Sequence, residues 1–426
     1  MAHAVSVFDL VSSLSEAIDL VSPRVASHNL HTAWIAHAIA REMQLPEPWV
    51  TQLVLAACLH DVGGLSLQER LDALDFDAED NRHGETGAAL LSQFAPFRPL
   101  ARIIREHHAP WESLSETEAI EREPDLTEGE RLLRGILLLA DRVDVCIKPG
   151  MSLSAQVPGI VRKIGEAEAG RFNPDALDAF LTVANRATWW EAIKDGTCHE
   201  RLSKGTTCET IAINGSDMTH MFSLFGRIVD FRSPYTASHS AAVAACAARL
   251  GGKFGFDADG IRMLELAGYL HDIGKLAVPK ELLEKHAPLT KGEYRIIRDH
   301  PFQSGNVLRH LKAFTQLRIW VSQHHERMNG KGYPCHVQGE SLSLGSRILA
   351  VADVFVALTE NRPYRTGMNL DLAGQAMDTM RIERSLDPDV LATLAASREE
   401  MDEVRVDAQK QERGEYHQFT RNLHPQ

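Results

Sequence analysis

The sequence has few aromatic residues and no long hydrophobic run. Of its 426 residues, 6% are aromatic and 44% are hydrophobic, which is typical of a globular protein long enough for two or three domains. No apolar run reaches the length that a membrane-spanning helix needs. A signal peptide is excluded because charges interrupt the N-terminal apolar runs at Asp9, Glu16, Asp19 and Arg24. We therefore expect a soluble, cytoplasmic protein with no membrane partner.

Paired cysteines and an excess of basic residues are also missing. The six cysteines are scattered without a CxxC pair, so neither a disulfide framework nor a zinc ribbon is indicated, and a reducing cytosol fits best. Acidic residues outnumber basic residues by 58 to 45, which gives a net charge of −13. This balance argues against DNA, RNA or an anionic membrane as a general partner. An anionic ligand would need local positive groups.

Strand-like alternation of apolar and polar residues is rare. Apolar residues instead recur every three or four positions, as in "HTAWIAHAIAREM" and "RMLELAGYLHDI", and this spacing predicts an all-α protein. One β-branched run, "TTCETIAIN", lies between Gly205 and Gly215 and predicts a short strand or an extended linker. The charged tail after Arg398 predicts a solvated helix that frays near Gly414.

The second half of the chain repeats the first. "SPRVASH", which ends at His28, returns as "SPYTASH", which ends at His239, and "LHDVGGL" returns as "LHDIGKL". The other repeated polar residues keep the same order: His60 and Asp61 with His271 and Asp272, His83 with His300, His107 and His108 with His324 and His325, and Asp141 with Asp353. This colinearity indicates a tandem duplication of one helical domain.

The repeated polar residues are of the types that bind metals. In "YLHDIGKLAVP", His271 and Asp272 are expected side by side on an apolar helix, where they are costly to bury without a partner. A lone His-Asp pair is more often a hydrogen-bonded core pair, but five histidines and two aspartates in one repeat favour a metal cluster. In the second repeat these are His239, His271, Asp272, His300, His324, His325 and Asp353.

The second repeat resembles the HD-GYP phosphohydrolases, which cleave cyclic dinucleotide messengers such as cyclic di-GMP. Between about Phe222 and Met401 it carries, in the family's order, "HDIGK", a lone histidine, "HHE" leading into "GYP", and "AD" with "RPYR". The resemblance implies a metal-dependent phosphodiesterase. In such an enzyme a metal-bridged hydroxide opens one phosphodiester and yields the linear 5′-phosphorylated dinucleotide.

The resemblance also implies a role for each site residue. Asp272 would bridge two ions, of which His239, His271 and Asp353 complete one, and His300, His324 and His325 complete the other. Mixed imidazole and carboxylate ligation favours iron or manganese and leaves zinc and nickel open. Lys275 would act with Asp272 in catalysis, and the implied substrate-binding residues are Lys275, Arg362, Arg365, Gly332, Tyr333 and Pro334.

Two positions depart from the family pattern in the second repeat. Tyr235 stands where members with a third ion carry glutamate, so we expect two ions and the linear dinucleotide as the main product. Asn329 replaces the usual loop aspartate, which is acceptable if the residue stabilises a turn through its side chain.

The first repeat keeps the ligand types but loses the substrate groups. Gly64 replaces the lysine, Gly150 and Leu153 stand where the second repeat has arginines, and there is no GYP motif. We expect a degenerate, regulatory or structural domain that holds metal. The alternatives are a second catalytic site and a plain buried polar network. The candidate ligands of this second metal site are His28, His60, Asp61, His83, His107, His108 and Asp141.

The expected architecture is two tandem HD-type helical bundles. Residues 1–200 would form the degenerate domain, 201–217 a linker, 218–405 the catalytic HD-GYP domain and 406–426 a charged tail. Alternative functions are hydrolysis of cyclic GMP-AMP or another nucleotide, or a non-catalytic dinucleotide sensor or scaffold. The expected partners are a cyclic dinucleotide and, as an open alternative, a second copy of the chain in a homodimer.

Overall fold

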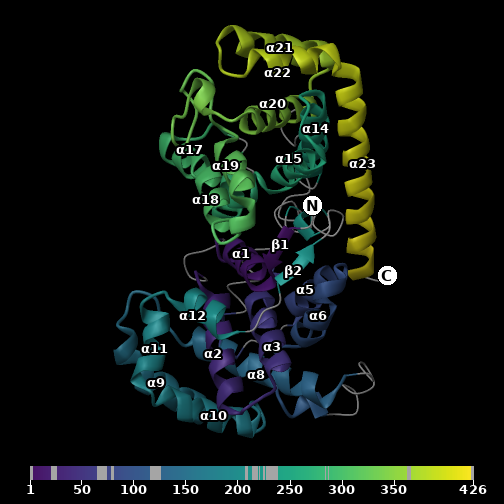
Figure 1. Ribbon diagram of the computed structural model, residues 1–426. Coiled ribbons are helices and arrows are strands. Elements are labelled where there is room, and N and C mark those ends of the chain that lie inside the picture. Colours follow the sequence, from purple (N-terminus) through teal and green to yellow (C-terminus); the bar gives the residue numbers. More distant parts are fainter. Residues whose placement is uncertain are drawn as a thin grey trace. The chain divides into compact units, whose positions relative to one another are not determined.

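Helices make up almost all of the regular structure, which confirms the all-α prediction (Figure 1). The computed structural model describes residues 3–20, 26–64, 74–77, 81–115, 126–206, 210–213, 219, 221–223, 226, 238–283, 285, 287–361 and 366–423. Within these residues, no helix is both long enough and apolar enough to span a lipid bilayer.

The chain divides into two compact units. The first unit is Ser6–Ile211, and the second unit combines Ala212–Gln426 with Met1–Val5. Two short strands, β1 (His3–Ser6) and β2 (Thr210–Ile213), pair as a two-stranded sheet. β2 confirms that the run "TTCETIAIN" forms a strand. β1 was not predicted, because four residues are too short to show an alternating pattern.

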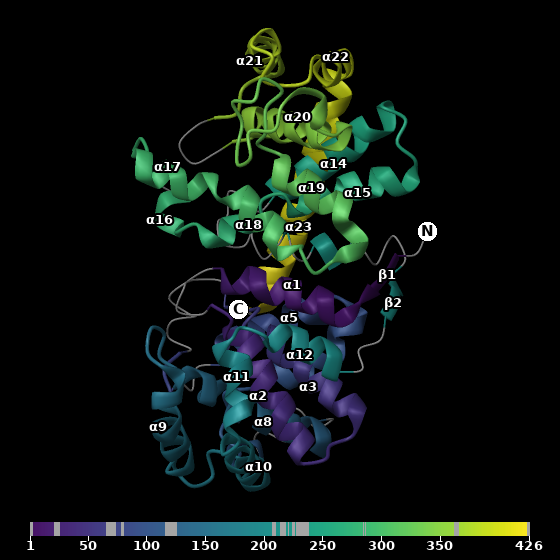
Figure 2. The same ribbon diagram turned by 60° about the vertical axis from the view of Figure 1, so that its left-hand side comes forward.

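The first unit is built from α-helices and short 3-10 segments. The helices α2, α3 and α8 pack against one another and form its centre, with α6 and α10 against them (Figure 1, Figure 2). The elements are α1 (Val7–Asp19), α2 (His28–Glu42), α3 (Glu47–Leu59), α5 (Arg82–Ser92), η1 (Ala95–Phe97), α6 (Arg98–Ile104), η2 (Ser113–Ser115), α8 (Glu128–Val145), α9 (Leu153–Gly165), α10 (Pro174–Ala184), α11 (Ala187–Lys194) and α12 (Cys198–Gly205).

The second unit repeats this central arrangement. Its helix α14 packs against α15 and α20, as α2 packs against α3 and α8 in the first unit. The elements are α14 (His239–Lys253), α15 (Ala258–Leu270), η3 (Ile273–Ala277), α16 (Lys280–Leu283), α17 (Lys291–Arg298), α18 (His300–Val307), η4 (Lys312–Phe314), α19 (Thr315–Gln323), η5 (Gly339–Ser341), α20 (Leu344–Thr359), α21 (Leu370–Ile382), α22 (Pro388–Ala396) and α23 (Arg398–Leu423).

Capping side chains fix where the central helices begin. Thr127 and Glu130 form a capping box at the start of α8, and Asp257 accepts a hydrogen bond from the Gly260 amide at the start of α15. These contacts satisfy amide groups that have no partner in the first helical turn. Ser343 caps α20 in the same way. The caps set the register of the helices that carry the aspartates Asp141 and Asp353.

The predicted fraying of the C-terminal helix is wrong. α23 is helical from Arg398 to Leu423 without a break at Gly414, and it packs along α14 (Figure 1). Met401 and Gln409 are buried, and Arg405 bonds both Asp402 and Gln409. One face of the helix therefore belongs to the core of the second unit. The high density of charges concealed this face in the sequence.

Candidate metal centres

The ligand-type residues of the second unit lie where several helices end. His239 and His300 are the first residues of α14 and α18, while His271 and His324 follow the last residues of α15 and α19. Asp353 alone lies inside a helix, α20. The expectation that His271 lies within a helix is therefore wrong. The chain leaves the α-helix at this residue and continues as the 3-10 segment η3.

These residues form one buried cluster around Asp272. Its Oδ2 lies 3.3 Å from His271 Nε2, and its Oδ1 lies 3.2 Å from His300 Nε2. The two oxygens thus face different histidines, which is the arrangement that a bridging carboxylate needs. Potential ligand atoms also lie within 4.8 Å of one another in two triplets: His239, His271 and Asp353, and His300, His324 and His325.

Backbone hydrogen bonds orient the imidazole rings. The Nδ1 atoms of His271, His300 and His324 lie 2.7, 2.6 and 2.7 Å from the carbonyl oxygens of Gly268, Ile297 and Val321, respectively. A nitrogen that donates to a carbonyl carries the proton, so Nε2 of each ring presents a lone pair to the cluster. The Nε2 atoms of His300 and His324 lie 3.2 Å apart.

Two buried atoms in the cluster fit the ligand positions of a cation. The Nε2 of His271 and the Oδ1 of Asp272 make no hydrogen bond to any residue that the structure describes. Their polar neighbours are other atoms of the same cluster, and buried polar atoms without a hydrogen bond are costly. A divalent metal ion would satisfy both, and imidazole and carboxylate groups are suitable ligands for it. The residues present therefore fit a metal centre.

The charges of His324, His325 and Asp272 match this interpretation. Burial and the neighbouring His325 lower the pKa of His324 well below its usual range, and burial lowers the pKa of His325 to about 3. Both rings are therefore neutral, as metal ligands must be. Although burial alone would raise it, the pKa of Asp272 is held well below its usual range by His271 and Lys275. Asp272 is therefore ionised.

Glu360 is a residue of the cluster that the sequence did not reveal. Its buried carboxylate lies 3.0 Å from Nδ1 of His239, so it orients this ring as the backbone carbonyls orient the others. Burial would lower the pKa of His239, but Glu360 and Asp353 raise it to about 10. At neutral pH this ring is therefore protonated when no ion is bound, and it would lose its Nε2 proton on binding one. In the first unit Asp144 has the same role, because its Oδ2 lies 2.7 Å from His28 Nδ1. The sequence did contain one sign of this role, because an acidic residue follows each helical aspartate: Asp144 follows Asp141, and Glu360 follows Asp353.

We expect the substitution Glu360→Gln to weaken metal binding in the second unit by about 10- to 100-fold, because an amide orients and polarises the imidazole less well than a carboxylate does. Competition with a chelator of known affinity measures this change. Glu340→Gln is the matched control, because Glu340 is exposed on η5. Equal metal affinity in both variants would contradict the role of Glu360.

A glycine permits the close approach between η3 and α18. A Cβ on Gly274 would lie 2.0 Å from the His300 carbonyl oxygen and 2.6 Å from the Ser304 amide nitrogen. In the first unit, a Cβ on Gly63 would lie 2.1 Å from the His83 carbonyl oxygen. Both repeats therefore need glycine at this place, because a side chain would push the HD pair away from the next histidine.

We expect Gly274→Ala to destabilise the protein by about 1–3 kcal/mol, because the added methyl group overpacks a backbone contact. Metal bound in the second unit should fall with it. Gly292→Ala on α17 is the control, because a Cβ there has no other atom within 4 Å. Thermal unfolding with and without added Mn²⁺ measures both effects, and equal melting temperatures for the two variants would refute the steric explanation.

The predicted substrate-binding residues are only partly described by the structure. The Lys275 ammonium lies 2.5 Å from Asp272 Oδ2, and its side chain is 23% exposed. The Tyr333 ring lies 4.8 Å from the His325 ring, measured between centroids, so the loop of Gly332, Tyr333 and Pro334 borders the cluster. Arg362, Arg365 and Tyr235 lie outside the described residues.

Asn329, Glu326 and the close approach of Gly332 to Arg327 fix the position of this loop. Asn329 Oδ1 accepts a hydrogen bond from the Lys331 amide at 3.1 Å, so asparagine stabilises the turn as expected. The buried Glu326, which the sequence analysis had not assigned a role, accepts a bond from the Cys335 amide at 2.6 Å. A Cβ on Gly332 would lie 2.3 Å from the Arg327 amide nitrogen. The loop therefore lies against Glu326 and Arg327, the residues that follow His325.

The first unit assembles a similar cluster. His28 Nε2 lies 3.2 Å from both Asp141 Oδ1 and His60 Nε2, and His83 Nε2 lies 3.2 Å from His107 Nε2. The cluster's potential ligand atoms lie within 4.8 Å of one another in three groups: His28, His60 and Asp141; His60, Asp61 and His107; and His83, His107 and His108. The structure therefore brings together all seven residues selected from the sequence.

The two clusters differ in their access to solvent. In the second unit, the side chains of His325 and Asp353 are 18% and 10% exposed. Their counterparts in the first unit, His108 and Asp141, are each 1% exposed. The second cluster can meet a ligand from solvent, whereas this side of the first cluster is covered.

An arginine covers the first cluster. Arg142, which is fully buried, donates from Nη2 to His108 Nε2 at 3.0 Å and to Asp141 Oδ2 at 2.5 Å. Its Nη1 donates to the carbonyl oxygens of Asp75 and Phe76. The guanidinium thus places a fixed positive charge among the ligands and ties residues 74–77 across them. The second repeat has Val354 at this position.

Comparisons with known proteins agree with the duplication. Two family models, each described as HD domain, match residues 25–145 and 223–390. A 3′3′-cGAMP-specific phosphodiesterase 1 of Vibrio cholerae is 28% identical over 384 residues, 87% of this chain and 86% of the relative. The 3′3′-cGAMP-specific phosphodiesterase 3 of the same species is 26% identical over 435 residues, 91% of this chain and 93% of the relative.

Other similarities cover one repeat or concern the fold. A cyclic di-GMP phosphodiesterase of Pseudomonas aeruginosa is 40% identical over 136 residues, 32% of this chain and 33% of the relative. The crystal structure of a cyclic GMP-AMP specific phosphodiesterase of V. cholerae matches with a TM-score of 0.67 and 23% identity, over 93% of this chain and 98% of that chain. The two-domain helical fold is therefore shared with that structure.

Proposed function

Because the chain belongs to the HD domain family, with one copy of the domain in each unit, we propose that it is a metal-dependent phosphodiesterase that hydrolyses a cyclic dinucleotide. The observation that carries this proposal is the second cluster. It combines two triplets of ligand-type residues around Asp272 with Lys275 and the Tyr333 loop at its partly exposed side. Relatives that align with most of this chain are named as cyclic dinucleotide phosphodiesterases.

In this proposal Asp272 is shared by two ions. His239, His271 and Asp353 would hold one ion, and His300, His324 and His325 would hold the other. When bound, such a pair supplies a water of lowered pKa and neutralises charge on phosphoryl oxygens. Iron and manganese fit the mixed imidazole and carboxylate set.

The remaining residues of the site orient the substrate. The Lys275 ammonium lies beside Asp272 and is partly exposed, so it can move to a phosphate oxygen as a point charge. The Tyr333 ring contacts His325, and the Arg298 guanidinium lies 4.6 Å from the centre of that ring. Arg298 thus adds a second positive group at this side of the cluster. We keep Arg362 and Arg365 as proposed dinucleotide contacts.

The identity of the two bases is the finer part of the proposal. The motifs of the second repeat favour cyclic di-GMP. The two relatives that align with most of this chain are named for 3′3′-cGAMP, which makes this dinucleotide the second candidate. The expected product is the linear dinucleotide in either case.

We propose that the first unit binds metal without catalysing hydrolysis. Its cluster keeps all seven ligand types, but Gly64 has no side chain to replace Lys275, and Arg142 donates to His108 Nε2 and Asp141 Oδ2. His28, His60, Asp61, His83, His107 and Oδ1 of Asp141 would therefore hold the metal. We keep residues 1–200, 201–217 and 218–405 as the proposed first domain, linker and catalytic domain, although α12 continues to Gly205 and the first compact unit to Ile211. Residues 406–426 are not a separate element, because α23 continues through position 406. A cytoplasmic location and a homodimer stay predictions.

A substrate panel tests the proposed function. The purified full chain is incubated with cyclic di-GMP, 3′3′-cGAMP and cyclic di-AMP in the presence of Mn²⁺ or Fe²⁺, and the products are separated by chromatography. We expect a linear dinucleotide from at least one of the first two substrates, and the ratio of kcat/KM values then identifies the preferred one. Intact cyclic dinucleotides in every reaction, with metal bound in the second unit, would contradict an enzymatic function and favour a sensor or scaffold.

A further inference from the structure

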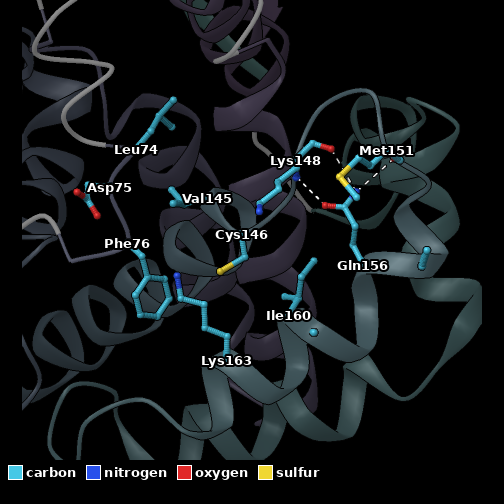
Figure 3. Close-up of a pocket in the computed structure, with 12 residues that line it drawn as sticks. Leu74, Asp75, Phe76, Val145, Cys146, Lys148, Met151, Gln156, Ile160 and Lys163 are labelled. Atoms are coloured by element: carbon cyan, nitrogen blue, oxygen red, sulfur yellow. Dashed lines mark hydrogen bonds between the residues drawn. The ribbon is translucent and has the colours of Figure 1, made fainter.

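The first unit contains a pocket outside its histidine cluster. The pocket has a volume of about 660 Å³, which is within the range of small-molecule sites. It is formed by residues 74–76, the end of α8, the following loop and α9 (Figure 3). Its lining is Leu74, Asp75, Phe76, Val145, Cys146, Lys148, Met151, Ala155, Gln156, Gly159, Ile160 and Lys163.

Two lysines give the pocket its positive charge. Lys148 and Lys163 extend into it on either side of Cys146 (Figure 3). Within the part of the chain that the structure describes, neither ammonium group forms an ion pair with a carboxylate. Lys163 Nζ instead lies 3.8 Å from the centre of the Phe76 ring. The lining also holds one carboxylate, Asp75, so the two lysines leave a local excess of positive charge. In a chain with a net charge of −13, such an excess favours an anionic ligand.

The wall that carries Lys148 is held in place. Gln156 Oε1 accepts a hydrogen bond from the Lys148 amide at 2.8 Å, and its Nε2 donates to the carbonyl oxygens of Lys148 and Met151 at 3.2 and 3.3 Å (Figure 3). The loop that follows α8 is therefore formed before any ligand binds. Val145, Ile160 and the 60% exposed Met151 add apolar surface that a nucleobase can cover.

The same pocket is separated from the histidines. Arg142 donates to the carbonyl oxygens of Asp75 and Phe76 on one side and to Asp141 and His108 on the other. Arg171 also donates to the Phe76 carbonyl and lies 4.6 Å from its ring centre. Residues 74–77 and Arg142 therefore separate a ligand in the pocket from the histidine cluster of the first unit.

We propose that this pocket is a non-hydrolysing binding site for a phosphate-bearing ligand of nucleotide size. Lys148 and Lys163 bind the phosphate group, and Val145, Met151 and Ile160 contact the base. Because the site lies at the end of α8, which also carries Asp141 and Asp144 of the first cluster, a bound ligand acts on the first unit. This inference concerns a different unit from the proposed hydrolytic site and does not depend on hydrolysis there.

Cys146 offers a local readout of binding, because its thiol lines the pocket. The full chain is treated with N-ethylmaleimide, and the labelling rate of the Cys146 peptide is followed by mass spectrometry. The probes are GMP, a cyclic dinucleotide, its linear dinucleotide and inorganic phosphate. A ligand at about ten times its Kd should slow labelling about tenfold. The tested variant has both Lys148→Ala and Lys163→Ala, and Lys204→Ala on α12 is the control.

We expect protection of Cys146 in the wild type and in Lys204→Ala, and its loss in the double variant with an unchanged circular dichroism spectrum. Protection by nucleotides but not by phosphate assigns a nucleotide site, and equal protection by phosphate assigns the site to free phosphate. No protection by any probe at millimolar concentration would overturn the proposal, as would equal protection in the double variant. A double variant that unfolds is replaced by Lys148→Gln with Lys163→Gln, judged by the same criteria.

Discussion

Asp272→Asn is expected to abolish hydrolysis. The two oxygens of Asp272 face His271 and His300 at 3.3 and 3.2 Å, and an amide offers only one oxygen with no negative charge to hold a pair of cations. Loss of several kcal/mol of transition-state stabilisation corresponds to a fall of about a thousandfold or more in turnover. Product chromatography and metal analysis of the purified variant measure turnover and ion content together.

The matched control for this experiment is Asp61→Asn, which makes the same change in the first cluster. It should leave turnover close to that of the wild type, because it alters no residue of the second unit. Near-normal hydrolysis by Asp272→Asn would show that the two-ion interpretation of the second cluster is wrong. A normal metal content with lost turnover would limit Asp272 to a role other than metal binding.

His60→Ala combined with Asp61→Ala is expected to remove metal from the first unit and to leave hydrolysis within about threefold of the wild type, because changes at separate sites are usually independent. Both residues are buried, and His60 Nε2 and Asp61 Oδ1 are 3.6 Å apart. Burying seven polar side chains costs free energy unless a partner such as a metal ion compensates for the lost contacts with water. Metal analysis and hydrolysis assays on the same preparation measure both quantities.

Two results of this experiment would revise the account. An unchanged metal content in the double variant would mean that the first cluster is a hydrogen-bonded polar network. Lost hydrolysis in a folded protein that keeps its second-unit metal would move the chemistry, or its control, to the first unit. Asp61→Asn, the smaller change, separates these outcomes from unfolding of the first unit.

The residues of the two clusters could be selected from the sequence because the chain contains two copies of the pattern. His and Asp on apolar helical backgrounds repeat in one order, from His28 and His239 to Asp141 and Asp353. Each copy thus served as a check on the other. The helical class was equally accessible, since three- and four-residue spacing depends on local sequence alone.

The residues that the sequence did not reveal act through contacts between distant segments. In the sequence, Arg142 looks like an ordinary charged residue of a helix. The fold places its guanidinium between His108 and the carbonyl oxygens of Asp75 and Phe76. Glu360 similarly meets His239 across 121 positions of sequence. Spacing along one helix cannot indicate such pairs.

Helix ends were a second source of error. The apolar run before His271 continues into "IGKLA", so hydrophobic spacing placed the histidine inside a helix. In the structure the α-helix ends at Leu270, because Gly274 must lie against the His300 carbonyl oxygen and the chain tightens into η3. The constraint comes from α18, which is distant in sequence.

Metal removal followed by reconstitution tests the central claim most directly. The full chain is stripped with a chelator, titrated with Mn²⁺ or Fe²⁺, and assayed at each step for bound ions and for the linear dinucleotide, with Asp272→Asn in parallel. We predict no product from the stripped protein, recovery of hydrolysis as ions bind to the wild type, and no recovery in the variant. Hydrolysis at the original rate by protein without bound ions would contradict a metal-dependent reaction in the second unit.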